Sequence, residues 1–500
     1  MRKIRLLSLM LALLMLISCF TACGGDDEDD DDVTPDDFNG SIADTDNNDK
    51  ETDDSQPSTQ YVPTEGSADA VIEIYTANDL ITKLTRKGTF ILKADIDLTD
   101  VNYKPFGNYM YPFEGKLIGE GHKIRGLKIT EITGESVGPA YITYKFTYSG
   151  LFGATKNAEI SDLTIEGAEV SYSTSTEYCY ALSGILAGYM IDTKVTDCNI
   201  SGKVSAVSKR YYAYSGAVCA MARGGSFTGI TVDAEVVATD SDERALAGGL
   251  IAYVFKGSKI TDCASDGNVK AVANYGVAYC GGLVAYTREA VFTVCKSEAD
   301  VYAEVLKIDS YKGTAGSATA GGLFGLVSSE SDNAKAKLIR CYSLGNTVTA
   351  KGNSNTAYVG GIAARVLLSD ITDCYSRSDV NASSKTKTVY VGTAFGSIEK
   401  EYKIKGCFGY GNVSAEHTNV SQVYIGGFCG YPIKPSEERV TNCAYNVGAT
   451  FTINGEAAPA IGPSALPLSS GMFTLAGLKN ALQWKDSEWV QNGMTLIPVL

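Results

Sequence analysis

Only two histidines, His122 and His417, occur in the 500 residues. A zinc-binding HExxH helix needs two histidines one turn apart and a three-histidine site needs one more, so neither site can be built. His122 lies in a Gly-rich turn and His417 in one rich in Thr and Asn, which predicts two exposed turn residues. The chain has no G-x-S-x-G elbow and no phosphate loop ending in Lys-Ser or Lys-Thr. The sequence therefore predicts no catalytic residue, no metal site and no cofactor.

Carboxylates are the remaining candidates for chemistry, because polysaccharide lyases and hydrolases use clustered acids, with or without calcium. Acidic or amide residues recur at one repeat position, just before the position that most repeats fill with cysteine. They are Asp162, Asp197, Asp262, Asp373 and Asn442, and the same position holds Gly229, Val294, Arg340 or Gly406 in the other repeats. An active site needs two or three acids that converge once, whereas this pattern recurs along the chain. We interpret these residues as turn positions.

Cysteines also recur at one position of a repeat. Seven of the 13 cysteines follow this pattern, and Leu163 or Ile230 takes the place in two repeats. Substitution by Leu and Ile indicates a buried, small, apolar site. Equivalent residues in stacked strands lie about 4.8 Å apart, beyond the roughly 3.5–4.5 Å that a disulfide needs. We expect a ladder of free thiols, and no zinc site because no C-x-x-C pair exists.

Tyrosines are the candidates for ligand binding. Tyr279, Tyr358, Tyr390 and Tyr424 each lie three residues before the second small residue of a Gly-rich cluster. They could form an aromatic stripe on which sugars stack. The alternative is that tyrosine simply favours half-buried strands.

The elements that position these residues follow from a repeat. Nine clusters of the form small-small-apolar-apolar-small, such as Gly321-Gly322-Leu323-Phe324-Gly325, recur between residues 148 and 430 at spacings of 32 to 40 residues. Their anchor positions are 150, 184, 216, 249, 282, 322, 361, 393 and 427. A fixed period of this size indicates stacked units that bury their apolar faces against one another.

Each repeat reads as three short strands separated by turns, since its apolar runs are short and flanked by glycine. Three parallel strands per coil form an all-β solenoid, the parallel β-helix. Thr76-Ala77-Asn78-Asp79 predicts a capped helix at the open N-terminal end, and Leu475, Leu478 and Leu482 predict a second short helix near the C-terminus. Two repeats carry insertions, between Asp300 and Ala320 and between Ser328 and Lys337. Added loops on a solenoid often mark its working face.

The N-terminus indicates an exported lipoprotein. A basic head precedes an apolar run from Leu6 to Ile17, which is typical of a signal peptide. Phe20-Thr21-Ala22-Cys23 then resembles a bacterial lipobox, which predicts lipidation, with palmitate, at Cys23; Cys19 is the alternative. Residues 24–66 hold sixteen Asp and Glu against one Lys, so they predict a solvated, disordered tether. The rest of the mature chain is near neutral, which argues against nucleic acid as a partner.

The Gly-Gly-Leu-Phe-Gly clusters resemble the GLUG repeat. Asp95-Ile96-Asp97-Leu98, Phe113-Glu114-Gly115 and Trp489 to Pro498-Val499-Leu500 resemble the lead-in coils and the ending of proteins that carry it. The resemblance covers residues 70–500. It implies a right-handed parallel β-helix of the pectate-lyase-like kind on secreted or surface proteins, often adhesin-like and sometimes beside a metallopeptidase domain, which this chain lacks.

The expected organisation has five parts: a signal peptide at 1–22, the acidic tether at 23–70, the cap and lead-in coils at 71–145, nine GLUG repeats at 146–462 and a C-terminal cap at 463–500. We expect a membrane-anchored protein displayed at the bacterial cell surface. We expect it to bind a glycan or a host or matrix protein and not to be an enzyme. The alternatives are a polysaccharide lyase or hydrolase and a passive surface spacer.

Overall fold

The computed structural model describes residues 62–498, which lie in one compact unit, Pro57–Leu500. Gaps in this range fall at 131–134, 138–144, 176–177, 210, 308–315, 332–333, 346, 401, 432–438, 461–464, 470–471, 486–488 and 493–494, and only the backbone of 135–137, 492 and 495 is described. The predicted signal peptide, Cys19, Cys23 and most of the tether lie outside the described residues.

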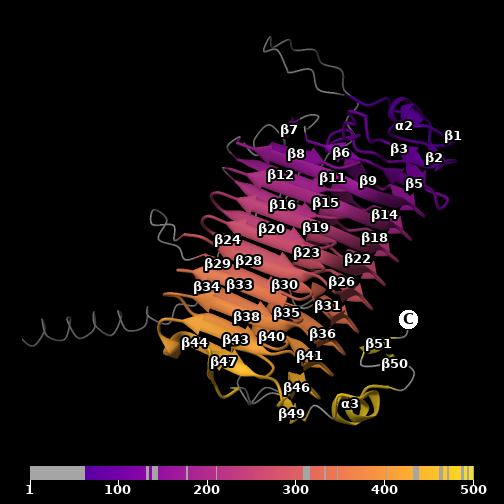
Figure 1. Cartoon of the computed structure of the whole chain (residues 1–500). Helices are drawn as coiled ribbons and strands as arrows, with labels where there is room; N and C mark the ends of the chain where they lie inside the picture. The colour runs from indigo at the N-terminus through magenta and orange to yellow at the C-terminus, as the bar shows by residue number, and fades with distance from the viewer. Residues whose placement is uncertain are drawn as a thin grey trace, which may run out of the picture. The chain divides into compact units, whose positions relative to one another are not determined.

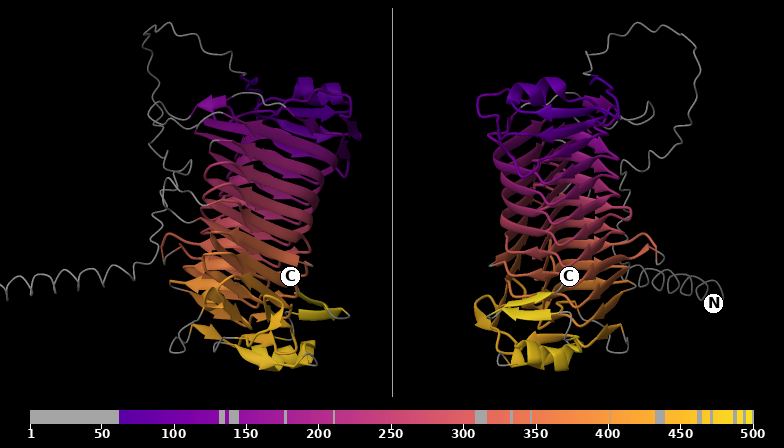
Figure 2. Two further views of the ribbon diagram at one scale, coloured as in Figure 1. Left: turned by 60° about the vertical axis from the view of Figure 1, so that its left-hand side comes forward. Right: turned by 90° about the vertical axis from the view of Figure 1, so that its right-hand side faces the viewer.

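The fold is an all-β parallel β-helix of about eight turns, as the repeat predicted (Figure 1). The coils follow one another from the indigo N-terminal part to the yellow C-terminal part (Figure 2). Each coil passes through four sheets, which we number 1 to 4 in chain order. The prediction of three strands per coil is therefore wrong. The Gly-rich cluster is not one strand; it is a corner between two strands, because its glycines let the chain turn sharply.

Sheets 1 and 2 follow each other in every coil. Sheet 1 consists of β1 (Val71–Ile74), β2 (Thr89–Leu92), β4 (Lys116–Ile118), β10 (Glu159–Ser161), β14 (Lys194–Thr196), β18 (Ser226–Thr228), β22 (Lys259–Thr261), β26 (Val291–Thr293), β31 (Ala336–Ile339), β36 (Ser369–Thr372), β41 (Lys403–Lys405) and β45 (Val440–Thr441). Sheet 2 consists of β3 (Ile96–Asp97), β5 (Lys123–Arg125), β6 (Lys128–Ile129), β11 (Thr164–Thr174), β15 (Asn199–Ser208), β19 (Thr231–Asp240), β23 (Ala264–Ala273), β27 (Lys296–Ser297), β28 (Asp300–Val305), β32 (Tyr342–Ser343), β33 (Thr347–Asn353), β37 (Tyr375–Ser376), β38 (Asp379–Ser384), β42 (Phe408–Gly409), β43 (Val413–His417), β46 (Ala444–Asn446), β47 (Phe451–Ile453), β48 (Glu456–Ala457) and β49 (Leu466–Leu468).

Sheets 3 and 4 complete the coil. Sheet 3 consists of β7 (Glu135–Val137), β8 (Lys145–Ser149), β12 (Cys179–Gly184), β16 (Tyr212–Gly216), β20 (Arg244–Gly248), β24 (Val277–Gly281), β29 (Ser317–Gly321), β34 (Thr356–Gly360), β39 (Val389–Gly392) and β44 (Val423–Gly426), with β7 antiparallel to β8. Sheet 4 consists of β9 (Phe152–Lys156), β13 (Ala187–Ile191), β17 (Cys219–Arg223), β21 (Ile251–Phe255), β25 (Val284–Arg288), β30 (Phe324–Ser328), β35 (Ala363–Leu367) and β40 (Phe395–Glu399).

Short helices lie near both ends of the stack. At the N-terminal end, α2 (Ala77–Lys83) begins with a capping box in which Thr76 accepts the Asp79 backbone N–H, and α2 buries Leu80 completely. At the C-terminal end, α3 (Leu475–Leu482) and the hairpin of β50 (Trp489–Asn492) and β51 (Thr495–Pro498) contribute to a separate apolar cluster. A one-turn 3₁₀ helix, η2 (Val420–Gln422), precedes β44. Within the part of the chain that the structure describes, neither α2 nor α3 has the length and apolar character needed to span a membrane.

The residues just before the cysteine position lie in turns, as predicted, and we call them the turn column. Asp262 has a φ of 53° and Val294 a φ of 57°. The same left-handed conformation recurs in each coil where the chain passes from sheet 1 to sheet 2. The full set is Asp162, Asp197, Gly229, Asp262, Val294, Arg340, Asp373, Gly406 and Asn442. Asp, Asn and Gly tolerate this conformation best, so the recurring acids here serve the backbone turn.

The interior of the coils holds one continuous apolar core, and the cysteine column lies within it. All eleven cysteines from Cys179 to Cys443 are buried and free, and they include the seven of the column for which the spacing argument predicted free thiols. In the column, the Cys341 backbone N–H contacts the Cys374 sulfur at 3.4 Å, and the Cys374 N–H contacts the Cys407 sulfur at 3.4 Å. Burial raises the pKa of the Cys198 thiol to about 12, so this thiol is protonated and unreactive at neutral pH.

Candidate functional site

The two histidines differ in their surroundings. His122 is half-buried, and its Nδ1 lies 3.4 Å from Asp95. His417 is only 4% exposed, so the prediction of an exposed turn residue is wrong for this position. Its Nδ1 accepts the Asn419 backbone N–H at 2.7 Å, and its Nε2 lies 2.9 Å from the Lys387 carbonyl oxygen. Nδ1 thus serves the turn after β43, and Nε2 contacts the connection between β38 and β39 in the preceding coil. Both ring nitrogens have partners, which explains why a polar ring is buried there.

No metal-binding site is visible among the described residues. There, no group of three or more His, Cys, Asp or Glu side chains is arranged to hold a metal ion.

Sheets 3 and 4 meet at the Gly-rich corner, and this corner brings their outward-facing side chains together. Tyr279 on β24 contacts Tyr286 on β25 edge to face, with ring centres 6.1 Å apart. Tyr286 in turn stacks on Tyr253 of β21 at 4.8 Å. All three rings are buried, although they lie outside the main core. In the middle coils, the corner is thus filled by aromatic side chains.

The later coils open this corner into a tyrosine ladder, which we define as Tyr358, Tyr390 and Tyr424. Parallel register places Tyr358 of β34 beside Tyr390 of β39, and Tyr390 beside Tyr424 of β44. Their ring centres are 5.0 and 5.1 Å apart, with interplanar angles of 10° and 14°. The first two rings are half-buried, whereas Tyr424 is 36% exposed. Burial, with a smaller contribution from Tyr424, raises the pKa of Tyr390, which keeps this phenol a hydrogen-bond donor.

The structure separates Tyr279 from the other three predicted tyrosines. Sheet 3 pairs Tyr279 with Thr319, and Thr319 with Tyr358, so a small side chain interrupts the column. Tyr279 is also only 3% exposed. The sequence position is equivalent, but Tyr279 is not available at the surface of the ladder.

Three charged or aromatic neighbours of the ladder were not predicted. The Arg365 guanidinium lies 4.7 Å from the centre of the Tyr358 ring and pairs with Glu399 at 3.4 Å. Ser397 donates to the other Glu399 oxygen at 2.8 Å. Tyr431, 41% exposed, contacts Tyr390 at 5.7 Å. Arg365 occupies the repeat position of Tyr253 and Tyr286, four residues after the anchor, and this shared position was the sequence signal that could have revealed it.

The ring stacking decides what the ladder can bind. A sugar that stacks on tyrosine needs an open ring face. In this ladder Tyr390 lies between two rings, whereas Tyr358 stacks on Tyr390 and has the Arg365 guanidinium over its ring. Mainly ring edges and hydroxyl groups of these two tyrosines therefore remain for a ligand. Among the described residues the stack ends at Tyr424, which is the one place where a face is left for stacking.

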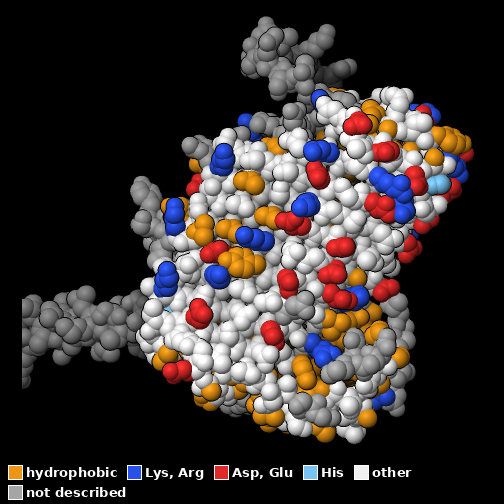
Figure 3. Space-filling model, viewed as in Figure 1, with side chains coloured by type: hydrophobic (Ala, Val, Ile, Leu, Met, Phe, Trp, Pro, Cys, Tyr) orange, Lys and Arg blue, Asp and Glu red, His pale blue; other side chains and the backbone are white. Residues whose placement is uncertain are grey.

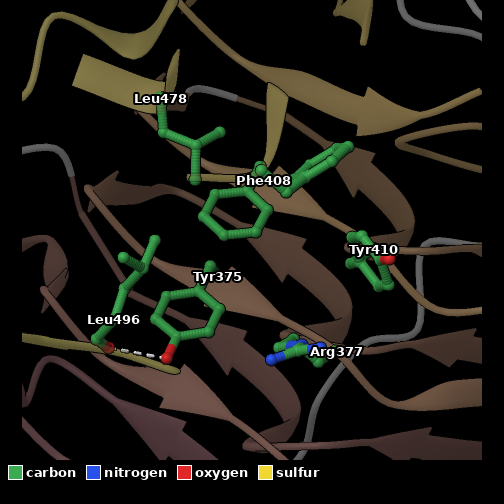
Figure 4. Close-up of a pocket in the computed structure, with 7 residues that line it drawn as sticks. Tyr375, Arg377, Phe408, Tyr410, Leu478 and Leu496 are labelled. Carbon is green, nitrogen blue, oxygen red and sulfur yellow. Dashed lines mark hydrogen bonds between the residues drawn. The ribbon is translucent and has the colours of Figure 1, made fainter. Parts of the chain in front are cut away.

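A small cavity of about 40 Å³ lies beside the C-terminal cap (Figure 4). Tyr375 and Phe408 of sheet 2 form one side, and Leu478 of α3 and Leu496 of β51 face them. The Tyr375 hydroxyl donates to the Leu496 carbonyl oxygen at 2.7 Å, which fastens the hairpin to the stack. The cavity is a packing gap under the cap, large enough for roughly three waters.

The predicted inserted loops lie partly outside the described residues. Residues 308–315 and 332–333 fall in gaps, so the structure does not test them as a binding face.

No family model matches the sequence, and no curated protein matches it. Two solved structures resemble the fold. One is a Bacteroides ovatus protein named as an immunoglobulin A1 protease, with 15% identity and a TM-score of 0.31 over 86% of this chain and 91% of that chain. The other is named IgA1 protease, with 14% identity and a TM-score of 0.33 over 80% of this chain. This chain spans only 25% of the second structure. At these values no residue role can be carried over.

The prediction that the protein is not an enzyme is contradicted by these two names, and we withdraw it. The physical reason is that not every kind of active site has a local sequence motif. A motif inventory detects zinc helices, serine elbows and phosphate loops, but carboxylate chemistry needs no local motif. A β-helix fold by itself does not determine function.

Proposed function

We propose that the protein is an exported, lipid-anchored, adhesin-like β-helix protein of the bacterial cell surface, and that it binds an extracellular protein through the tyrosine ladder. The observation that carries the proposal is a stack of three tyrosines that reaches the surface: Tyr358 and Tyr390 are half-buried, and Tyr424 is 36% exposed. A stack that served only the fold would have no need to continue to an exposed ring with a second exposed tyrosine, Tyr431, beside it.

The geometry favours a protein over a glycan at this site. Stacked rings present edges and phenol hydroxyls, and Arg365 adds a planar cation held by Tyr358 and Glu399. Tyr and Arg are, with Trp, the residues enriched among those that contribute most at protein interfaces. Tyr gives a large contact area with little loss of side-chain entropy. Glycan binding at the ladder would rest on the single face at Tyr424.

Attachment to a membrane is proposed from the sequence. The apolar run, the lipobox ending at Cys23 and the acidic tether behind it support a lipoprotein, and the nine Gly-rich clusters support the GLUG assignment. The change Cys23→Ala should move the protein from the membrane fraction to the soluble fraction, with Cys19→Ala as the matched control. Release by Cys19→Ala instead would identify Cys19 as the acylated residue, and a soluble wild-type protein would exclude a lipid anchor.

Binding is tested with the full chain carrying Cys23→Ala, applied to surfaces coated with fibrillar collagen, fibronectin, mucin or immunoglobulin A1. The last probe is included because both similar structures carry its name. Tyr424→Ala should reduce binding by about tenfold or more, the usual effect of removing an interface tyrosine. Tyr75→Ala is the control, since Tyr75 is 51% exposed and lies outside the ladder. Equal binding by both variants would exclude the ladder, and gel analysis of each probe reports any cleavage.

A further inference from the structure

The outward face of sheet 2 carries a second group of aromatic and charged residues, on a different sheet from the ladder. In-register pairing places Lys270 of β23 beside Tyr302 of β28, and Glu304 beside Lys351 of β33. Lys270 and Lys351 are 81 positions apart in the chain, yet their ammonium groups each lie 5.4 Å from the centre of the Tyr302 ring. A third cation, Lys307, lies 5.7 Å from the ring of Tyr275.

The tyrosine is fixed between the two lysines. Its hydroxyl donates to the Glu304 carboxylate at 2.7 Å, and the Asn353 side-chain amide donates to the other Glu304 oxygen at 3.2 Å. Burial, together with Glu304, raises the pKa of Tyr302, so the phenol stays protonated. Cation–π contact holds an ammonium group near the ring but leaves its other hydrogen-bond donors free to face solvent.

We call Lys270, Lys307 and Lys351, with Tyr302 and Tyr275, the cationic patch. All three lysines are exposed, and the one carboxylate among them, Glu304, has both oxygens engaged by Tyr302 and Asn353. Figure 3 shows Lys and Arg side chains over the part of this face that β28 and β33 occupy. The patch is therefore locally positive on a body that is otherwise close to neutral.

A shallow hollow lies on the same sheet and leads to the patch. Its lining comes from β11, β15 and β19 and consists of Glu169, Val170, Ser171, Lys203, Val204, Ser205, Glu235 and Val237. Val237 is in register with Lys270, so the hollow and the patch are neighbours along the stack. Charges at the hollow are balanced by ion pairs, Lys128 with Glu169 at 3.1 Å and Lys203 with Glu235 at 3.0 Å.

We propose that the outward face of sheet 2 binds an anionic polysaccharide along the stack, with its carboxylate or sulfate groups at Lys270, Lys307 and Lys351. Coils repeat about every 4.8 Å, so a linear polymer meets equivalent positions in successive coils. Hydroxyl and amide side chains, including Ser171, Ser205, Thr349 and Asn381, continue the same columns and match the hydrogen-bonding groups of sugars. Nucleic acid fits less well, because its binding needs many more phosphate contacts than three lysines supply.

The test measures binding of the full Cys23→Ala chain to three probes: hyaluronan, which carries carboxylates, dextran sulfate, which carries sulfates, and neutral dextran. We expect saturable binding to at least one charged polymer, weakened by salt, and none to neutral dextran. Stronger binding of hyaluronan or of dextran sulfate identifies which anion the patch prefers. Binding of neutral dextran as tightly as the charged polymers, or no binding to either charged polymer, would overturn the proposal.

Two double variants locate the site. K270Q with K351Q should weaken binding by about tenfold, in line with the loss of two charge contacts. K194Q with K259Q removes the same charge from exposed positions of β14 and β22 on sheet 1 and should change binding less than about twofold. An equal loss of binding in both double variants would show non-specific electrostatic attraction. A short DNA duplex that competes as well as the polysaccharide would exclude selectivity for a glycan. Tyr424→Ala should leave binding of the polysaccharide unchanged. Failure of the polysaccharide proposal can therefore be told apart from failure of the proposal that the tyrosine ladder binds a protein.

Discussion

Tyr390 and Tyr424 lie face to face, with ring centres 5.1 Å apart and planes inclined by 14°, although 34 positions separate them in the chain. Their contact follows from parallel pairing of β39 and β44, which sets equivalent side chains of adjacent coils beside each other. The same contact that stabilises the rings hides their faces. The ladder is therefore both a packing device and a surface of edges and hydroxyls.

Tyr390 should matter more for stability than Tyr424. Tyr390 contacts the rings of Tyr358, Tyr424 and Tyr431, whereas Tyr424 is 36% exposed. We expect Tyr390→Ala to lower the free energy of unfolding by about 2–3 kcal/mol and Tyr424→Ala by about 1 kcal/mol or less. Denaturant titration of both variants measures the difference. Equal losses of unfolding free energy would show that ring stacking contributes little beyond the burial of apolar surface area.

Asp240 should make stability depend on pH. The side chain is 1% exposed and accepts the backbone N–H groups of Asp242, at 3.0 Å, and of Glu243. Burial, opposed by these hydrogen bonds, raises the pKa of Asp240 to about 8. Because its folded pKa lies above the unfolded value of about 4, the folded chain retains a proton that the unfolded chain has lost in this window, and stability falls as pH rises from 4 to 8.

The matched change is Asp240→Asn, which keeps an oxygen acceptor for the turn and removes the titration. We expect the unfolding midpoint of this variant to be higher than wild type at pH 8 and to vary less between pH 5 and 8. Asp242→Asn, in the same turn, is the control. A wild-type midpoint that does not fall over this interval would contradict the assignment to Asp240.

Val294 should be the least favourable residue of the turn column. It is β-branched and has a φ of 57°, a conformation that costs such residues about 1–2 kcal/mol. Val294→Asn should therefore raise the thermal unfolding midpoint, and the reverse exchange, Asp262→Val, should lower it by a similar amount. Calorimetry of the two variants gives the sign of each. A lower midpoint for both would mean that packing of Val294, and not its backbone, dominates this position.

The structure, with seven cysteines in the ladder and four outside it, predicts eleven free thiols in the described body. Protein that is unfolded under non-reducing conditions should incorporate an alkylating reagent at every cysteine from Cys179 to Cys443, as counted by mass spectrometry. In the folded protein the same thiols should react slowly, because each one is buried. Detection of several disulfides in the unreduced protein would contradict the prediction that these thiols are free.

Tyr375 should hold the C-terminal hairpin in place. Its buried hydroxyl donates to Leu496 at 2.7 Å, and Tyr375→Phe leaves that carbonyl without this donor. We expect a loss of about 1–2 kcal/mol and faster hydrogen exchange in β51. Tyr342→Phe, in the same stacked column one coil earlier, is the control. Unchanged exchange in β51 would show that apolar contacts alone secure the hairpin.

The sequence by itself determined the repeat, the parallel β-helix, the capped N-terminal helix, the turn column and the thiol ladder. Each of these is encoded locally: a period fixes the stacking, Asp, Asn and Gly fit left-handed turns, and exchange of Cys with Leu and Ile marks a buried position. The tertiary structure alone decided which residues of different strands and coils lie beside each other. The sharp Gly-rich corner produced four sheets in place of three strands, and the turn after β43 buried His417. Register between coils placed Thr319 between Tyr279 and Tyr358, and brought Lys270 and Lys351 to one ring. Such contacts depend on the angle of a corner and on pairing between distant strands, which residue spacing within one repeat does not specify.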